Sequence, residues 1–359
     1  MDKGTVIVGM SGGIDSSVTA ALLKDQGYNV IGVTMQIWDG GCTPSNGVTQ
    51  HACYGPGEEE EIAQTEKISR QLGIPFHVID LRKEYKHHVL DYFRQEYLFG
   101  RTPNPCIKCN SKIKFGALLD NVKKSNISFD YFATGHYVNV AYNETSQRYL
   151  LKRAKDLKKD QTYFLFYLSQ EQLKQCIFPL GQYTKEEIRE MSRQKGFGLE
   201  NKPESQNFVA QGYTSLLEGA TLPGPILDTQ GKKLGEHKGI HYYTVGQRKR
   251  LGIAAEYPLY VVAIDHTNNA VVVGPKEDIY SNRLIASELN WISIDRLSEP
   301  MKLSAKIRYV QHEETAWVEP LENGDIRVTF DNPQMAITPG QAIVFYDQDT
   351  VVGGGIIQK

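Results

Sequence analysis

The chain has 359 residues, 40% of them hydrophobic and 23% charged, which is typical of globular proteins. Forty lysines and arginines against 42 aspartates and glutamates give a net charge of −2, which excludes a globally basic nucleic-acid coat protein. No apolar stretch approaches the roughly 20 residues of a membrane helix, and the first apolar run is too short for a signal peptide. With an odd number of cysteines, five, these features predict a cytoplasmic protein without a disulfide framework or membrane partner.

The first 200 residues alternate between strand and helix patterns. Apolar, β-branched runs predict strands at 5–11, 29–38, 75–81 and 131–137. Helical periodicity predicts helices at 16–26, 58–72 and 184–197, and a hairpin is expected at 139–154. This alternation predicts an α/β fold with a doubly wound, Rossmann-like parallel sheet.

The pattern changes near residues 200–225. Beyond that point short alternating strands are separated by turn signals, such as Asp228-Thr229-Gln230-Gly231. This half is predicted to form two small, mostly β domains, divided near residue 280, of which the last is a β-barrel.

A glycine-rich loop, Gly9-Met10-Ser11-Gly12-Gly13-Ile14-Asp15-Ser16-Ser17, joins the first strand to the first helix. Its adjacent glycines let the backbone approach a ligand closely. Its hydroxyls and the amides of the helix start can donate to an anion, and Asp15 is a candidate ligand for Mg²⁺. The loop lacks the lysine of G-x-x-x-x-G-K-[ST]. A bare strand-to-helix turn is the alternative, but so specific a string favours a phosphate loop.

A second distinctive segment, Gly100 to Asn110, contains the pair Cys106 and Cys109 in a CxxC spacing. Lysines at 108, 112 and 114 surround the pair and are expected to lower its thiol pKa. In a cytosolic protein CxxC indicates half of a metal site, a redox pair or a persulfide carrier. The remaining alternative is two buried structural cysteines, which the prolines and lysines of this loop disfavour.

Other cysteines extend the possible metal chemistry. Cys53 together with Cys106 and Cys109 would supply three thiolates to a 4Fe-4S cluster, leaving one iron open for substrate or sulfide. Addition of His51 or Cys42 would instead give a closed zinc site, and spacing does not separate the two. Cys176 lies in an apolar stretch and is expected in the core.

The string SGGIDSS resembles the pyrophosphate loop of the ATP pyrophosphatases, whose domain is adenine-nucleotide α-hydrolase-like. More motifs follow in order, and together they resemble the tRNA-specific 2-thiouridylase family over nearly the whole chain: GRTPNPCxxCN (from Gly100), ATGHY (from Ala133), KDQTYFL (from Lys159), GQRK (from Gly246) and TPGQ (from Thr338). The resemblance implies ATP-dependent adenylation of C2 of the wobble uridine, followed by sulfur insertion that gives 2-thiouridine, AMP and pyrophosphate.

The resemblance also implies site residues. The catalytic residues would be Cys109 as persulfide carrier, Cys106 and Asp15. ATP would contact Gly9, Met10, Ser11, Gly12, Gly13, Ile14, Asp15, Ser16, Met35 and Gly135. The tRNA, its wobble uridine flipped out of the anticodon loop, would contact Asn104, Pro105, Cys106, His136, Lys159, Asp160, Gln161, Arg308, Tyr309 and Gln341.

The implied domain division is a catalytic domain with a tRNA-binding extension at 1–205, a central β domain at 206–282 and a barrel at 283–359. Two basic clusters, Arg148 to Lys159 and Arg248 to Arg250, are natural phosphate contacts or solvated faces. The implied cofactors are ATP, Mg²⁺ and the possible 4Fe-4S cluster. The sulfur donor would be a cysteine desulfurase, a relay protein or free sulfide.

The chain departs from the family pattern at two positions. Val209 stands where the family's second catalytic cysteine is usual, and Cys106 stands where many members have aspartate. In one mechanism Cys109 carries a persulfide and Cys106 resolves it; in the other Cys53, Cys106 and Cys109 hold the cluster. The second is favoured because it also explains Cys53. Two other functions stay open: a carboxylate-activating, ammonia-using ligase, and a catalytically lapsed tRNA-binding protein.

Overall fold

The computed structural model describes residues 3–41, 52–199, 202, 207–209, 216–217 and 222–358. The chain forms two compact units. Unit 1 comprises Met1–Val89, Cys106–Gly212 and Asp349–Val351, and unit 2 comprises Leu90–Pro105, Tyr213–Gln348 and Val352–Lys359. Among the described residues, no helix combines the length and apolarity needed to cross a membrane.

Unit 1 is built on a parallel sheet whose described strands follow the order β4-β2-β1-β5-β8. The central strand β1 is its most protected element, with Val6, Ile7 and Val8 at 0% exposure. The chain runs outward from β1 through β2 to β4 and then returns to the other side of β1, which creates a switch point between β1 and β5. The strand bounds are β1 Thr5–Gly9, β2 Asn29–Gln36, β4 Phe76–Asp80, β5 Tyr131–Thr134 and β8 Cys176–Ile177.

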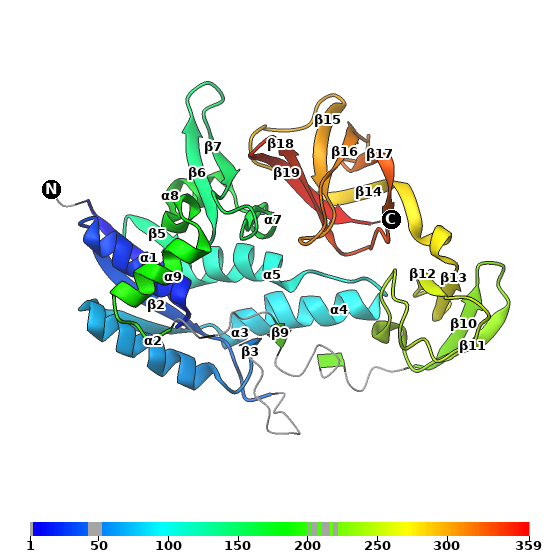
Figure 1. Ribbon diagram of the computed structural model, residues 1–359, viewed down its shortest axis with the longest axis horizontal. Coiled ribbons are helices and arrows are strands. Elements are labelled where there is room, and N and C mark those ends of the chain that lie inside the picture. The colour runs from blue at the N-terminus through cyan, green and yellow to red at the C-terminus, as the bar shows by residue number, and fades with distance from the viewer. Residues whose placement is uncertain are drawn as a thin grey trace. The chain divides into compact units, whose positions relative to one another are not determined.

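Helices α1 (Ile14–Asp25) and α9 (Lys185–Gln194) lie together beside the sheet (Figure 1). Val18 and Leu23 of α1 share a core cluster with Ile188 of α9. Helix α9 begins with a capping box in which Thr184 and Glu187 satisfy each other's backbone amides. The other helical segments of unit 1 are α2 Glu58–Leu72, α3 Arg82–Tyr85, η2 Cys109–Ala117, α6 Leu118–Lys124, α7 Thr162–Leu165, α8 Gln170–Gln175 and η3 Pro179–Gln182. Helical segments η1 (Lys86–Asp91) and α5 (Pro105–Lys108) span the boundary of the two units.

Two smaller strand pairs complete unit 1. Strands β6 (Val138–Asn143) and β7 (Arg148–Arg153) form an antiparallel hairpin. Strands β3 (Ala52–Tyr54) and β9 (Asn207–Val209) pair in parallel, although they are far apart in sequence.

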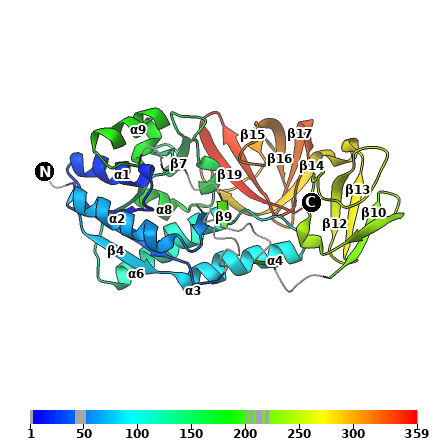
Figure 2. The ribbon, with the colours of Figure 1, turned by 60° about the horizontal axis from the view of Figure 1, so that its bottom comes forward.

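Unit 2 contains a four-stranded sheet of order β11-β10-β13-β12, visible in Figure 2. Its core includes Ile226, Val261, Val271 and Val273, each at 0% exposure. Helix α4 (Tyr92–Leu98) belongs to the same unit and packs on the 3-10 turn η5 (Ile240–Tyr242). The other segments here are β10 Gly224–Asp228, β11 Lys233–His237, β12 Tyr260–Asp265, β13 Ala270–Gly274 and η6 Lys276–Ile279.

The last six described strands of unit 2 close into a barrel. They follow the order β14-β17-β16-β15-β18-β19, and β14 also pairs with β19. Alternate residues such as Leu303, Ala305 and Ile307 point to the barrel core. The bounds are β14 Tyr280–Trp291, β15 Met301–Lys306, β16 Glu314–Pro320, β17 Ile326–Met335, β18 Ala342–Asp347 and β19 Thr350–Ile357.

The predicted fold class is confirmed: a Rossmann-like parallel sheet precedes small β units, the last of them a barrel. The first strand is shorter than the predicted 5–11 and ends at Gly9. It ends early because the chain turns at Gly12, whose φ of +69° is a left-handed conformation that favours glycine.

Candidate functional site

The phosphate loop lies between β1 and α1, at the switch point of the sheet. The Met10 amide continues the sheet by donating to the Val33 carbonyl at 2.8 Å, and the Ser11 amide donates to Ser16 Oγ at 3.1 Å. Gly13 is the N-cap of α1 and has no side chain with which to cap the first amides. The loop therefore presents a glycine backbone and the positive end of a helix dipole at one point.

The other residues expected to bind ATP gather at the same edge. Met35 lies near the end of β2 and is half-buried, and Gly135 directly follows β5. A Cβ atom on Gly135 would lie 2.8 Å from the carbonyl carbon of Asp15 and 2.9 Å from the amide nitrogen of Ser16. Only glycine fits here, so this segment and the phosphate loop are in direct contact.

Asp15 is held by a lysine that sequence reasoning missed. The ammonium of Lys185 lies 2.7 and 2.8 Å from the two carboxylate oxygens of Asp15, and the Tyr137 hydroxyl donates to Oδ1 at 2.8 Å. The Lys185 side chain is only 4% exposed. Its one sequence signal is its position, because a lysine in the first turn of a helix opposes the dipole and needs a local anion.

This contact bears on the predicted Mg²⁺ site. Both oxygens of Asp15 accept hydrogen bonds from Lys185, so a Mg²⁺ ion bound here would have to share the carboxylate with an ammonium. Within the described ranges no three His, Cys, Asp or Glu side chains are grouped to hold a metal ion.

Three thiols from two segments of the chain belong to unit 1. Cys53 comes from β3, Cys106 from α5 and Cys109 from the start of η2. Burial raises the pKa of all three, to about 11 for Cys106 and about 12 for Cys109, and Cys53 raises the pKa of both others. This mutual influence places the three cysteines in the same region of unit 1, although among the described residues they do not form a group that could hold a metal ion.

The predicted lowering of thiol pKa is wrong. Lys114 does lower the pKa of each of these thiols, but the loss of hydration is the larger effect. Cys53 and Cys106 nevertheless keep solvent-exposed surface, and Cys109 is half-buried. The stacked rings of Tyr54 and Tyr85, 5.7 Å apart and both buried, lie beside this cluster.

Position 209, where the resemblance implies a second cysteine, lies beside the strand that carries Cys53. Val209 is 4% exposed and pairs with Tyr54, the residue after Cys53. Cys53 therefore reaches the region from the strand next to Val209. Cys42 and His51 lie outside the described residues. Cys176 lies half-buried at the edge strand β8, and burial raises its pKa.

Several residues of unit 1 that are expected to contact tRNA make hydrogen bonds within that unit. His136 bonds to Thr134 Oγ1 at 2.7 Å, and burial holds its pKa well below the usual range. Asp160 is 5% exposed and accepts from Thr162 Oγ1 at 2.6 Å. Gln161 accepts from the Tyr137 amide at 2.9 Å. Asp160 and Gln161 thus hold their loop, and the backbone of Lys159 closes it by donating to the Asp156 carbonyl at 3.0 Å.

Unit 2 contains the remaining expected contacts: Asn104, Pro105, Arg308, Tyr309 and Gln341. Arg308 donates to the Thr338 hydroxyl at 2.9 Å, and Gln341 donates to the Thr102 carbonyl at 2.7 Å. The Thr102 amide also donates to the Pro339 carbonyl at 2.8 Å. The TPGQ segment therefore holds Thr102 in place, four residues before the first cysteine of the CxxC pair.

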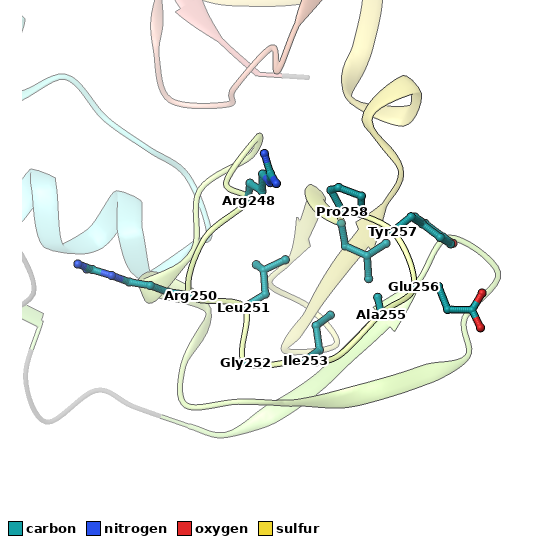
Figure 3. Close-up of a pocket in the computed structure, with 10 residues that line it drawn as sticks. Arg248, Arg250, Leu251, Gly252, Ile253, Ala255, Glu256, Tyr257 and Pro258 are labelled. Atoms are coloured by element: carbon teal, nitrogen blue, oxygen red, sulfur yellow. The ribbon is translucent and has the colours of Figure 1, made fainter.

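One basic cluster of unit 2 borders a pocket. Arg248 and Arg250 project outward from its lining, whose interior carries Leu251, Ile253 and Pro258 (Figure 3). Arg250 has a φ of +64°. The two arginines therefore lie on an irregular loop and not on a regular strand.

A parallel sheet with a lysine-free glycine loop at its switch point defines a nucleotide-binding domain of the HUP type. Family models agree: the tRNA methyl transferase HUP domain matches residues 4–210, the tRNA methyl transferase PRC-barrel domain 216–275, and the aminomethyltransferase beta-barrel domain 281–357.

The chain is 48% identical to tRNA-specific 2-thiouridylase MnmA of Acetivibrio thermocellus over 365 residues, which cover 100% of both proteins. It is also 48% identical to the protein of that name from Halothermothrix orenii, over 100% of this chain and 99% of that one. The chain belongs to the tRNA-specific 2-thiouridylase family.

The Asp15–Lys185 pair predicts a stability effect. Asp15→Asn leaves the nearly buried Lys185 ammonium without its counter-charge, and we expect the free energy of unfolding of unit 1 to fall by about 3 kcal/mol. Urea unfolding measures this. The double variant Asp15→Asn/Lys185→Met should recover much of the loss, and a double variant as unstable as the single one would contradict the pairing.

The raised thiol pKa values predict slow alkylation of metal-free protein. At pH 8 a thiol of pKa about 11, as for Cys106, is ionised in about one molecule in a thousand. Because the thiolate is the reactive form, the iodoacetamide rate at Cys106 and Cys109 should rise about tenfold per pH unit from pH 8 to 10. Peptide mass spectrometry measures each site. A plateau near pH 9, as for an ordinary thiol, would show that burial does not control these thiols.

Proposed function

We propose that this chain is an ATP-dependent tRNA 2-thiouridylase acting on the wobble uridine. The names of the relatives support this, and so does one observation: the glycine loop and the three thiols are parts of the same compact unit. The HUP-type domain supports ATP as the nucleotide. The expected location of the protein is the cytoplasm.

The proposed reaction has two steps. The C2 oxygen of uridine attacks the α-phosphorus of ATP, the bond to the β-phosphate breaks, and pyrophosphate leaves. The adenylated oxygen is then a good leaving group, and a sulfur nucleophile at C2 displaces AMP. The amides of Gly12, Gly13 and the first turn of α1 are placed to hold the departing pyrophosphate.

The sulfur carrier is proposed to be a 4Fe-4S cluster held by Cys53, Cys106 and Cys109. Thiols are the ligands such clusters use, and a four-iron cluster spans a wider gap than a single ion. The cluster would supply an iron that binds sulfide. Neutral thiols with raised pKa are poor nucleophiles, which disfavours the alternative of a persulfide on Cys109 resolved by Cys106.

The proposed partners are tRNA and a sulfur donor, which would be a cysteine desulfurase, a relay protein or free sulfide. The outward-facing Arg248 and Arg250 and the hairpin residue Arg148 are candidate phosphate contacts. The proposed domain boundaries remain 1–205, 206–282 and 283–359.

Pyrophosphate release separates the candidate functions. We expect release from ATP only when tRNA lacking 2-thiouridine is added, because the uridine oxygen is the attacking group. A carboxylate-activating ligase would release pyrophosphate without tRNA, and a lapsed tRNA-binding protein would release none. Methyl transfer, which the family model's name mentions, would need no ATP. Any of these three outcomes would contradict the proposal.

Iron analysis tests the carrier. Protein purified without oxygen should contain iron and acid-labile sulfide near four each per chain, and Cys53→Ala should lose both. Cys176→Ala is the matched control, because that thiol lies on β8 and outside the cluster. No iron, together with a Cys53→Ala variant that still thiolates tRNA, would favour the Cys109 persulfide.

A further inference from the structure

The phosphate loop needs positive charge from elsewhere. Residues Gly9 to Ser17 include no lysine or arginine, and their one charged side chain is the carboxylate of Asp15. A bound nucleoside triphosphate adds several further negative charges at the same place. Two lysines in the described part of unit 1 contact this loop from later in the chain, Lys185 and Lys202.

Lys185 is already committed to Asp15. Its ammonium meets both carboxylate oxygens and lies 5.7 Å from the centre of the Tyr137 ring. To leave Asp15, this almost fully buried charge would have to break a bidentate contact and lose its counter-charge. Lys185 therefore neutralises the loop's own carboxylate, and it does not offer its charge to a ligand.

Lys202 is held more loosely. Its ammonium donates to the Gly12 carbonyl at 3.2 Å, and the nearest Glu61 carboxylate oxygen is 3.9 Å away. Its side chain is 22% exposed, compared with 4% for Lys185. An ammonium has three donors, and its contacts with the described residues are one bond to a neutral carbonyl and one long ion pair, which leave capacity for a stronger acceptor.

The position of Lys202 suits a phosphate. It lies at Gly12, where the backbone has the left-handed conformation that brings a glycine loop close to an anion. Helix α2 backs this turn tightly, because a Cβ on Gly12 would lie 2.9 Å from both the Glu61 carbonyl oxygen and Thr65 Oγ1. The loop is therefore enclosed on that side, with an ammonium at its edge.

We propose that Lys202 is the phosphate-binding lysine that the loop itself lacks. Its ammonium contacts the β- and γ-phosphates of ATP, and the Glu61 carboxylate holds it in place before the nucleotide binds. The inference rests on the proposed ATP-dependent function and assigns the binding of the leaving pyrophosphate to a residue outside the glycine loop.

The test compares Lys202→Ala with Lys202→Arg and Lys195→Ala. Lys195→Ala is the matched control, because it also removes one lysine charge, from a partly exposed pair with Asp25 at 2.6 Å. Calorimetry measures the affinities for ATP, pyrophosphate and AMP. We expect Lys202→Ala to weaken ATP and pyrophosphate binding about tenfold or more, the loss typical of a charged hydrogen bond to phosphate.

AMP affinity should stay within about twofold of the unmodified chain, because AMP lacks the phosphates that Lys202 contacts. Lys202→Arg should retain most of the ATP affinity, and Lys195→Ala should change none of the three. Equal loss of ATP and AMP affinity in Lys202→Ala would overturn the inference, since it would indicate structural damage to the site. Unchanged ATP and pyrophosphate affinities would overturn it as well.

The failure of this inference can be told apart from that of the proposed function. A chain that binds ATP and releases pyrophosphate with tRNA, but is indifferent to Lys202→Ala, refutes only the role of Lys202. An unmodified chain that binds no ATP refutes both. Thermal melting of each variant accompanies the titrations, and Lys202→Gln provides a second neutral variant if Lys202→Ala does not fold.

Discussion

The ion pair between Lys185 and Asp15 is the constraint on which the nucleotide site depends. It joins the first turn of α9 to the first turn of α1, and Tyr137, two residues beyond Gly135, donates to the same carboxylate. Gly135 packs against the backbone of Asp15 and Ser16. Three segments of the chain, at residues 15, 135–137 and 185, are thereby held around one carboxylate at the end of the glycine loop.

The ionisation of the thiols depends on two opposing effects, the loss of hydration and the attraction of a nearby lysine. Around Cys106 and Cys109 the loss of hydration outweighs the attraction of Lys114, so these thiols resist ionisation on their own. Surroundings that disfavour isolated thiolates would favour a bound group whose positive charge the thiolates could share. Under the proposed cluster, Cys53 and Cys106 would serve as ligands, which would account for both cysteines in a chain with a valine at position 209.

Much of this molecule could be predicted from the sequence. The helix 58–72 and the sheet edge carrying Gly9, Met35 and Gly135 follow from local periodicity and from the rule that ligands bind at strand ends. The sign of the thiol pKa shifts could not be predicted, because burial is set by distant segments. Lys185 and Lys202 escaped notice for the same reason: each acts on a loop about 170 or more residues earlier, and sequence spacing carries no record of that contact.

The parallel pairing of β3 with β9 places Val209 beside the strand that carries Cys53. Only seven positions separate Lys202, at the phosphate loop, from Val209, which pairs next to Cys53. Two residues that are close together in the sequence therefore contact the glycine loop and the strand of Cys53. In the proposed reaction these are the places at which pyrophosphate departs and sulfur arrives.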